Sequence, residues 1–337
     1  MAAFGSVFMP RMAYSTFDGQ QWSTPTLVAA DSISLHPGAH VLHYASTCFE
    51  GLKAFRHDDN SINIFRMSAS VKRLQQSSQL LSLPSFDSQL LDDMIVDIVR
   101  HYADEVPATP GSMYIRPTHI GTEPAIGKAA SPSKTSMMYV LLSPVGDYFS
   151  GGARKLRLLV EDNAMRCAPH MGMVKSGGNY ASALQPILNA RQEVDADQVL
   201  FCPNGDVQET GAANFLLIDG NEIITKALDS SFLHGNTRAS ILTIARDMGF
   251  TVSERSLSVD ELLERVAKPG CEAALSGTAA VLAPVGTLIY QGQEYTVGGN
   301  AEADTPKTTQ LRAALNAIQW GQAPDTHGWL QRVSPIK

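Results

Sequence analysis

The stretch at residues 143–152, SPVGDYFSGG, is the feature that most limits how this chain can fold. It places one proline and three glycines between two strand-like runs, 137–142 and 156–160, and these residue types interrupt regular structure. At 337 residues the chain is also about twice the length of a usual single domain. Two domains are therefore predicted. Their bounds are residues 1–143 for the N-terminal domain, 144–152 for a linker, and 153–337 for the C-terminal domain.

The apolar pattern of the first half predicts strands and helices that do not alternate strictly. Residues 62–65 are typical of a strand, and Val71, Leu74 and Leu81 share one face of a helix that must end before Pro84. A second helix and two more strands follow before the linker. This mixture favours the α+β class over a parallel, doubly wound sheet.

Three positions in the second half make specific predictions about helices. One helix should begin at Thr237 and stop at Gly249, which suits a left-handed cap. Another should begin at Thr305 and Pro306, a capping residue followed by a first-turn proline. Pro186 should kink the helix after Tyr180 or delay its start.

Composition and charge exclude several classes of protein. Hydrophobic residues make up 44% of the chain, which is enough for a packed core, and the net charge of −7 disfavours nucleic acid and anionic membranes as partners. The four cysteines lie far apart, with no C-x-x-C pair, so neither a zinc site nor a disulfide framework is predicted. We expect no metal, because Pro37 and Gly38 interrupt the histidines at 36, 40 and 43. No apolar run suggests a membrane span or leader, so a cytoplasmic enzyme or binding protein is expected.

Two short segments could bind an anion. The run HGNTR at 234–238 precedes a predicted helix, and SGT at 276–278 follows a predicted strand. Exposed backbone N–H groups and hydroxyls at such places bind phosphate, but the same residues also make ordinary caps and turns. The residues alone leave both interpretations open.

Three charged residues stand in unusual surroundings. Lys175 lies between an apolar pair and two glycines, where burial would suit an amine that attacks a carbonyl, although a surface loop lysine has the same pattern. Glu209 precedes a run of small residues and could bond a buried ligand or simply be solvated. Arg73, on an amphipathic helix, is by default a surface residue.

Taken together and in this order, the segments resemble the branched-chain amino-acid aminotransferases, pyridoxal-phosphate (PLP) enzymes of fold type IV. The resemblance implies a two-domain α+β fold with a smaller N-terminal α/β domain and a larger C-terminal, PLP-binding domain that contains a barrel-like mixed sheet. It extends over nearly the whole chain. The matching runs are HYASTCFEGLKAFR (43–56), FRMSASVKRL (65–74), YIRPTHIGTEPAIG (114–127), VKSGGNY (174–180), QETGAANF (208–215), HGNTRASIL (234–242) and SGTAAVLAPV (276–285).

The resemblance implies a role for each matching residue. Lys175 is similar to the catalytic lysine that holds PLP as a Schiff base, Glu209 to the partner of the pyridine nitrogen, and Tyr180 to the group that bonds the phenolic oxygen. The phosphate would be bound by the residues Arg73, Asn236, Thr237 and Thr278.

The resemblance also implies a substrate site and a partner. The α-carboxylate would bind at Thr278 and Ala279, and Phe49 would line the aliphatic pocket. The far carboxylate of glutamate would bind to Arg116, Tyr114 and Tyr44. Tyr44 and the segment around residues 120–127 would reach the site of a neighbouring subunit, which implies a homodimer.

The function implied is transfer of the amino group of leucine, isoleucine or valine to 2-oxoglutarate. A D-amino-acid aminotransferase or an aminodeoxychorismate lyase of the same fold is the alternative, since both would share the lysine, the glutamate and the phosphate site. A PLP-binding protein without catalytic activity is a third class, which no residue supports.

Overall fold

The fold is described from a computed structural model that covers residues 4–147, 154–300 and 304–333. The chain forms two compact units. The first comprises Met1–Ser150, Val174–Gly177 and Ile318–Lys337, and the second comprises Gly151–Met173 and Gly178–Ala317. Among the described residues, none of the helices is both long and apolar enough to span a membrane.

The boundaries of the units differ from the predicted domain bounds in two places. Residues 174–177 and 318–337 are expected in the C-terminal domain but group with the first unit. The reason for the second difference is that β17 (Leu330–Val333) pairs antiparallel with β5 (Ile62–Phe65). Residues 144 and 145 of the expected linker belong to a strand, and residues 148–152 lie outside the described residues.

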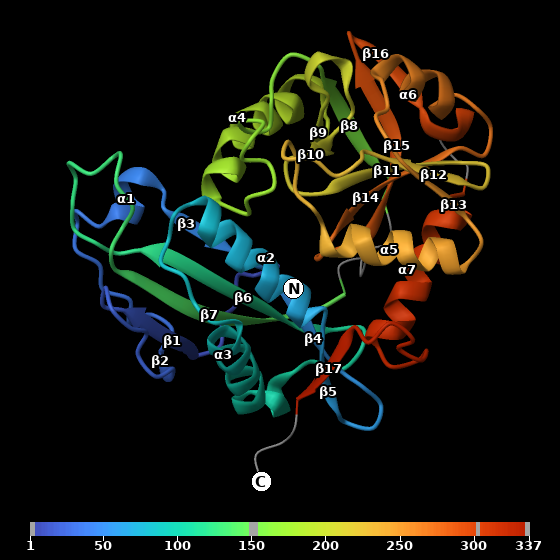
Figure 1. Cartoon of the computed structure of the whole chain (residues 1–337). Coiled ribbons are helices and arrows are strands. Elements are labelled where there is room, and N and C mark those ends of the chain that lie inside the picture. The colour runs from blue at the N-terminus through green and yellow to red at the C-terminus, as the bar shows by residue number, and fades with distance from the viewer. Residues whose placement is uncertain (1–3, 148–153, 301–303, 334–337) are drawn as a thin grey trace. The chain divides into compact units, whose positions relative to one another are not determined.

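The first unit is built on an antiparallel sheet whose strand order is β17-β5-β4-β6-β7-β1-β2, with β3 paired to β6 (Figure 1). Its remaining strands are β1 (Arg11–Phe17), β2 (Thr26–Ala29), β3 (Thr47–Phe49), β4 (Leu52–Arg56), β6 (Ser112–Gly121) and β7 (Ser136–Val145). Its helices are α1 (His40–Tyr44), α2 (Met67–Leu80), α3 (Ser88–His101) and the short 3₁₀ helix η1 (Ala103–Glu105).

Helices α2 and α3 cover one face of this sheet because each is amphipathic. The predicted residues Val71 and Leu74 of α2 are buried, and they join Leu91 and Ile95 of α3 in one core with alternate residues of the strands. Along β6, Met113, Ile115 and His119 belong to this face, since successive strand residues point to opposite sides. Tyr114, Arg116 and Thr118 therefore project from the other face.

The second unit contains a closed barrel of six strands. Neighbouring pairs run β10-β9-β8-β15-β14-β11, and β11 pairs back to β10, which closes the ring. The predicted barrel-like mixed sheet is thus confirmed, since β8 pairs parallel with β9 and β15 whereas the other pairs are antiparallel. The six strands are β8 (Leu156–Glu161), β9 (Gln198–Phe201), β10 (Glu209–Thr210), β11 (Asn214–Asp219), β14 (Glu272–Gly277) and β15 (Val281–Tyr290).

Other elements extend and cover this barrel (Figure 1). Strands β12 and β13 continue the sheet beyond β11, and β16 pairs with β15. Their bounds, with those of the helices, are β12 (Glu222–Thr225), β13 (Thr251–Glu254), β16 (Gln293–Thr296), α4 (Gly177–Val194), α5 (Asn236–Asp247), α6 (Val259–Val266), α7 (Pro306–Gln319), η2 (Pro203–Gly205) and η3 (Val297–Gly299).

The predicted helix ends are confirmed to within one residue. Of the two effects predicted for Pro186, the delayed start is wrong and the kink stays a prediction. Helix α5 is followed by Gly249 at a φ of +85°, and α7 begins at Pro306. Helix α4 already begins at Gly177 and continues through Pro186, so the proline does not delay its start.

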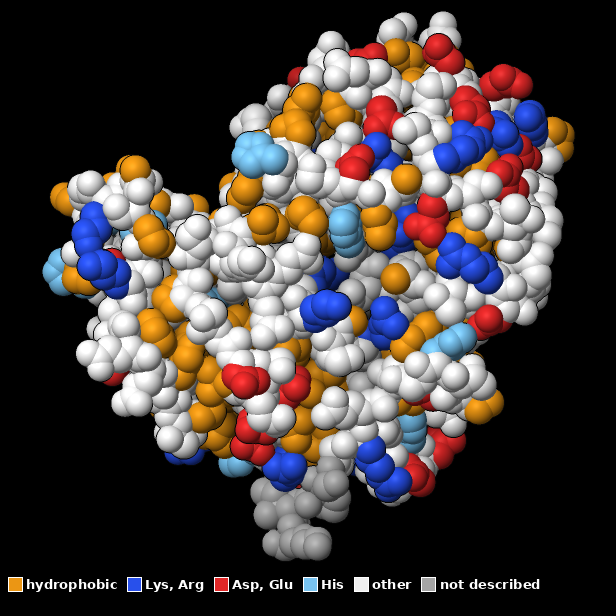
Figure 2. All heavy atoms as spheres, in the orientation of Figure 1, with side chains coloured by type: hydrophobic (Ala, Val, Ile, Leu, Met, Phe, Trp, Pro, Cys, Tyr) orange, Lys and Arg blue, Asp and Glu red, His pale blue; other side chains and the backbone are white. Residues whose placement is uncertain are grey.

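The face drawn in Figure 2 carries acidic, basic and apolar side chains intermixed.

His119 makes the stability of the first unit depend on pH. Its ring is completely buried against Trp22 and Phe86, and burial lowers the pKa of His119 to about 3. In the unfolded chain the pKa is about 6.5. As pH falls from about 6.5 to 3, the unfolded chain therefore binds a proton that the folded protein does not, and the free energy of unfolding falls by about 1.4 kcal/mol per pH unit.

We expect His119→Gln to reduce this loss of stability in acid. Urea unfolding at pH 7, 5.5 and 4.5 should show a shallower fall in the free energy of unfolding than in the wild type. His101→Gln, which alters an exposed histidine of α3, is the control. If the free energy of unfolding fell equally with pH in His119→Gln and the wild type, His119 would not be the residue that causes the loss of stability.

Candidate active site

The first group of polar residues surrounds Lys175, in the first unit. The peptide of Lys175 lies beside β3: the N–H of Phe49 donates to the carbonyl of Lys175 at 3.0 Å, and Cys48 forms a β-bridge with Ser176. The N–H of Lys175 donates to Oγ of Ser77 in α2 at 3.1 Å. These contacts explain why residues 174–177 group with the first unit. The amine Nζ of Lys175 lies 5.1 Å from the centre of the Phe49 ring.

Beside that lysine, the guanidinium of Arg116 packs on the rings of Phe49 and Tyr114. The guanidinium carbon of Arg116 lies 4.6 Å from the Phe49 ring centre and 5.2 Å from that of Tyr114, and Nη2 of Arg116 donates to the Tyr114 hydroxyl at 2.8 Å. Nε of Arg116 is buried and has no hydrogen-bond partner among the described residues. A β-carbon at Gly51 would lie 2.2 Å from the Tyr114 hydroxyl, so only glycine leaves room for this tyrosine.

Arg73 is not a surface residue, which was its default interpretation. It is 8% exposed and forms a double hydrogen bond with the fully buried Glu50, from Nε to Oε1 at 2.7 Å and from Nη2 to Oε2 at 2.9 Å. Ser77 lies one turn further along the same face of α2. The ion pair and the peptide of Lys175 are thus attached to neighbouring turns of one helix.

The second group surrounds Glu209, in the second unit. This carboxylate is 2% exposed, and its Oε1 accepts the N–H of Leu233 at 3.0 Å and lies 3.1 Å from Nη1 of Arg166. Its Oε2 accepts a hydrogen bond from Nδ2 of Asn214 at 3.1 Å. Such donors stabilise the ionised form of a buried carboxylate. The guanidinium of Arg166 also lies 5.2 Å from the ring centre of Tyr180, so Glu209 and Tyr180 share one arginine.

The start of α5 adjoins this carboxylate. Asn214 donates to the carbonyl of Leu233 at 2.8 Å, and a β-carbon at Gly235 would lie 2.1 Å from Oδ1 of the same asparagine. Gly235 is the N-cap residue and provides no side chain to cap the helix, so the first turn, with Asn236 and Thr237, presents backbone N–H groups typical of an anion site.

Thr278 and Ala279 lie in the tight connection from β14 to β15. The strand β14 ends at Gly277, β15 begins at Val281, and Val281 has a φ of +61°. Just before this turn, the hydroxyl of Ser276 is buried and has no hydrogen-bond partner among the described residues. Ser276 is paired with Asn214 across β14 and β11, so this turn, the start of α5 and Glu209 all adjoin one asparagine.

Tyr44 makes its contacts elsewhere. Its hydroxyl donates to the carbonyl of Ile126, and its ring packs on His40 at 4.9 Å. Within the described contacts the structure therefore joins Tyr44 to the segment near Ile126 and not to Arg116. That both reach a neighbouring subunit stays a prediction.

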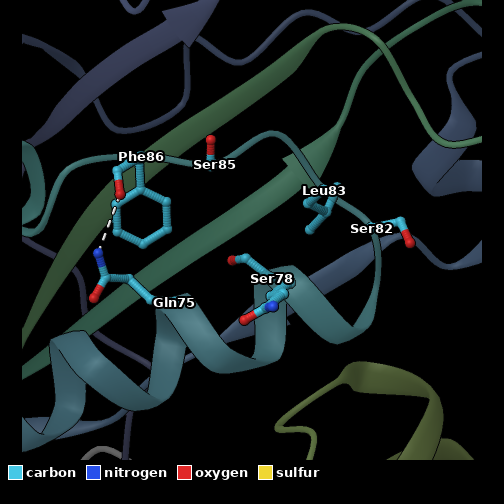
Figure 3. Close-up of a pocket in the computed structure, with 7 residues that line it drawn as sticks. Gln75, Ser78, Ser82, Leu83, Ser85 and Phe86 are labelled. Carbon is cyan, nitrogen blue, oxygen red and sulfur yellow. Dashed lines mark hydrogen bonds between the residues drawn. The ribbon is translucent and has the colours of Figure 1, made fainter.

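A separate pocket lies at the C-terminal half of α2 (Figure 3). Its volume is about 380 Å³, and its walls are uncharged, with serine and glutamine side chains beside Leu83 and Phe86. None of the predicted site residues lines it. Among the pocket residues, Ser78 forms hydrogen bonds with Cys48 and His119.

Sequence reasoning missed five residues of the two groups. The partners of Glu50, Ser77 and Arg166 are distant in the chain, whereas Asn214 lies only five residues from Glu209. A charged residue within an apolar run, as at Glu50 and Lys53, is a signal that could have indicated two of the five. Burial lowers the pKa of Lys53 to about 8, and this lysine lies opposite Tyr114 on paired strands. The residues missed are Glu50, Lys53, Ser77, Arg166 and Asn214.

Comparison with known proteins identifies the class. The family model described as "Amino-transferase class IV" matches residues 47–287. Of the structures solved by experiment, the Escherichia coli branched-chain aminotransferase has a TM-score of 0.78 at 25% identity, covering 96% of this chain and 99% of its own. The PLP form of the Thermobaculum terrenum branched-chain aminotransferase has the same fold, with a TM-score of 0.78 at 20% identity and 96% and 98% covered. The barrel and these matches define a class IV aminotransferase of fold type IV.

Relatives in sequence narrow the family further. The probable branched-chain-amino-acid aminotransferase of Streptomyces coelicolor is 36% identical over 340 residues, covering 98% of this chain and 92% of its own. Branched-chain-amino-acid aminotransferase 2 of Bacillus subtilis is 33% identical, with 99% and 93% covered. The chain belongs to the branched-chain-amino-acid aminotransferases, which confirms the predicted family, and its cofactor is PLP.

The residues present fit PLP. Its phosphate requires cations and N–H donors, and its ring nitrogen requires a carboxylate. The second unit has a buried carboxylate at Glu209, and α5 begins after Gly235 without a side-chain cap. Only glycine fits at that position, because a β-carbon would clash with Asn214. The buried hydroxyl of Ser276 has no hydrogen-bond partner among the described residues. The first unit offers Lys175 and the guanidinium of Arg73.

We expect Glu50→Gln to destabilise the cofactor-free protein by about 3 kcal/mol, because the loss of one charge leaves Arg73 buried without its counterion. Chemical unfolding without PLP measures this, since bound PLP would add its own stabilisation. Asp97→Asn is the matched control: it removes the acid of the exposed pair with Arg100 and should cost less than about 1 kcal/mol. An equal fall in the free energy of unfolding in the two variants would show that the buried pair stabilises the protein no more than the exposed pair does.

Proposed function

We propose that this enzyme transfers the amino group of leucine, isoleucine or valine to 2-oxoglutarate. The observation that carries the proposal is the stack of Phe49 and Arg116, with the buried Nε of Arg116 lacking a partner among the described residues. Arg116 and Tyr114 also line a cavity of about 280 Å³. An aromatic ring beside a guanidinium suits two substrates in turn, one with an aliphatic side chain and one with a far carboxylate.

We propose that residues of both groups bind one PLP molecule. Arg73, Asn236, Thr237 and Thr278 bind the phosphate, which agrees with the helix start at α5. Glu209 accepts a hydrogen bond from the ring nitrogen and keeps it protonated, and Tyr180 bonds the phenolic oxygen. Arg166 and Asn214 hold the Glu209 carboxylate in the orientation that this bond requires.

In this proposal Lys175 is the residue that moves the proton. When bound, PLP supplies the carbonyl that takes up the amino group and an electron-withdrawing ring. Nζ of Lys175 attaches the resting cofactor and, once released by substrate, removes the proton from the substrate α-carbon. The N–H groups and hydroxyl at Thr278 and Ala279 bind the α-carboxylate.

The working unit in this proposal is a homodimer. Two large apolar side chains near Tyr44 support it: Leu42 is 59% exposed and Ile126 is 67% exposed. Tyr44 and its neighbours at Ile126 would reach the site of the second subunit and contribute to the binding of the far carboxylate. A cytoplasmic location stays a prediction from the sequence.

The alternatives of the same fold are separated by their amino donors. A D-amino-acid aminotransferase or an aminodeoxychorismate lyase needs the same cofactor residues, so only substrates distinguish them. Assays of 2-oxo acid formation from L-leucine and D-alanine, and of aminodeoxychorismate cleavage, should show turnover with L-leucine alone. Turnover with D-alanine alone or with aminodeoxychorismate alone would contradict the proposal and identify the corresponding alternative.

Arg116→Met should raise the KM for 2-oxoglutarate by about 10- to 100-fold, because a charge-assisted hydrogen bond is lost, and should change the KM for leucine less than about threefold. Steady-state kinetics of the full reaction, with leucine and 2-oxoglutarate varied in turn, measures both values. Arg246→Met, which alters an exposed arginine, is the control. An equal rise in the KM values for 2-oxoglutarate and leucine would contradict a role for Arg116 in carboxylate recognition.

A further inference from the structure

Two serines that follow one another in α2 have different surroundings. Ser77 is completely buried, and its Oγ accepts the N–H of Lys175 at 3.1 Å. Ser78 is also buried, at 2% exposure, but its Oγ bonds Sγ of Cys48 at 3.3 Å and Nδ1 of His119 at 2.9 Å. Ser78 also lines the pocket of Figure 3, on the side of the helix where the 82–86 segment passes.

We infer that Ser77 is a positioning residue for Lys175, because its hydroxyl binds the backbone N–H of this lysine while β3 binds the carbonyl. The carbonyl of Lys175 is held by the N–H of Phe49 at 3.0 Å, and the N–H is held by Ser77, so both backbone hydrogen-bonding groups of the residue have partners in the first unit. Ser176, next in the chain, is bridged to Cys48. The inference rests on the proposed role of Lys175 in binding PLP.

This arrangement orients the side chain as well as the backbone. The direction in which a side chain leaves the chain follows from the backbone angles of its residue, so fixing the Lys175 peptide on two sides narrows the positions that Nζ can reach. The observed position puts Nζ over Phe49. Because Ser77 lies one turn from Arg73, α2 also links the lysine peptide to the Arg73–Glu50 pair.

The test compares Ser77→Ala with its neighbour. Without the acceptor, the N–H of Lys175 loses one hydrogen bond of ordinary strength, so its exchange with deuterium should become about tenfold faster. In the PLP-loaded enzyme kcat should fall about tenfold, with the KM for leucine changed less than about twofold. Exchange is measured by mass spectrometry on the peptide that contains Lys175, in the enzyme with PLP and after its removal.

Ser78→Ala is the matched control, because it also deletes a buried hydroxyl from α2 but touches neither group of the Lys175 peptide. It should leave exchange at Lys175 at the wild-type rate, even where thermal unfolding shows that the whole protein is less stable. Ser77→Cys keeps an acceptor atom at the same position in the side chain, but sulfur is the weaker acceptor, so the exchange rate of the Lys175 N–H should fall between those of the serine and alanine forms.

Three results would overturn the inference. Unchanged exchange at Lys175 in Ser77→Ala, or equal acceleration in Ser77→Ala and Ser78→Ala, shows that Ser77 does not fix this peptide. Faster exchange with unchanged kcat shows that the hydrogen bond forms but does not position the lysine for the reaction. Failure of the role proposed for Lys175 would be seen separately, as retained turnover in Lys175→Ala.

Discussion

The hydrogen bonds between the Lys175 peptide, β3 and α2 are the interaction on which the rest of the site depends. They attach four residues, 174–177, to the first unit although the chain on either side belongs to the second. The lysine amine is thereby fixed beside Phe49, next to Arg116, and α2 carries both Ser77 and Arg73. A buried N–H without a partner costs about 1–3 kcal/mol, so these partners decide where the segment lies.

The buried charges of the two groups are paired with other charges of the protein. Glu50 neutralises Arg73 in the first unit, and Arg166 neutralises Glu209 in the second. Burying an unpaired charge is costly, and these partners offset that cost. The pairing therefore allows Arg73 and Glu209 to be buried where the proposed roles of these two residues require them.

Much of the fold could be predicted because its signals are local. The helices α2, α5 and α7 are recognisable from apolar periodicity and end residues such as Gly249 and Pro306, and the family motifs identify the class. The barrel was expected only from the family resemblance. Local patterns could not predict its closure, because β10 contains only Glu209 and Thr210 and pairs with strands on both sides. For the same reason Glu50, Ser77 and Arg166 escaped detection: their partners lie 23, 98 and 43 residues away, by difference of residue numbers, and only tertiary structure brings them together.

The central claim is that Lys175, held by the first unit, is the lysine that binds PLP. Reduction of the PLP-loaded enzyme with borohydride, followed by proteolysis and mass spectrometry, tests it most directly, since the reduced cofactor stays on the side chain to which it was attached. We expect the added mass on the peptide that contains Lys175. Added mass on a peptide with another lysine, such as Lys53 or Lys226, would contradict it.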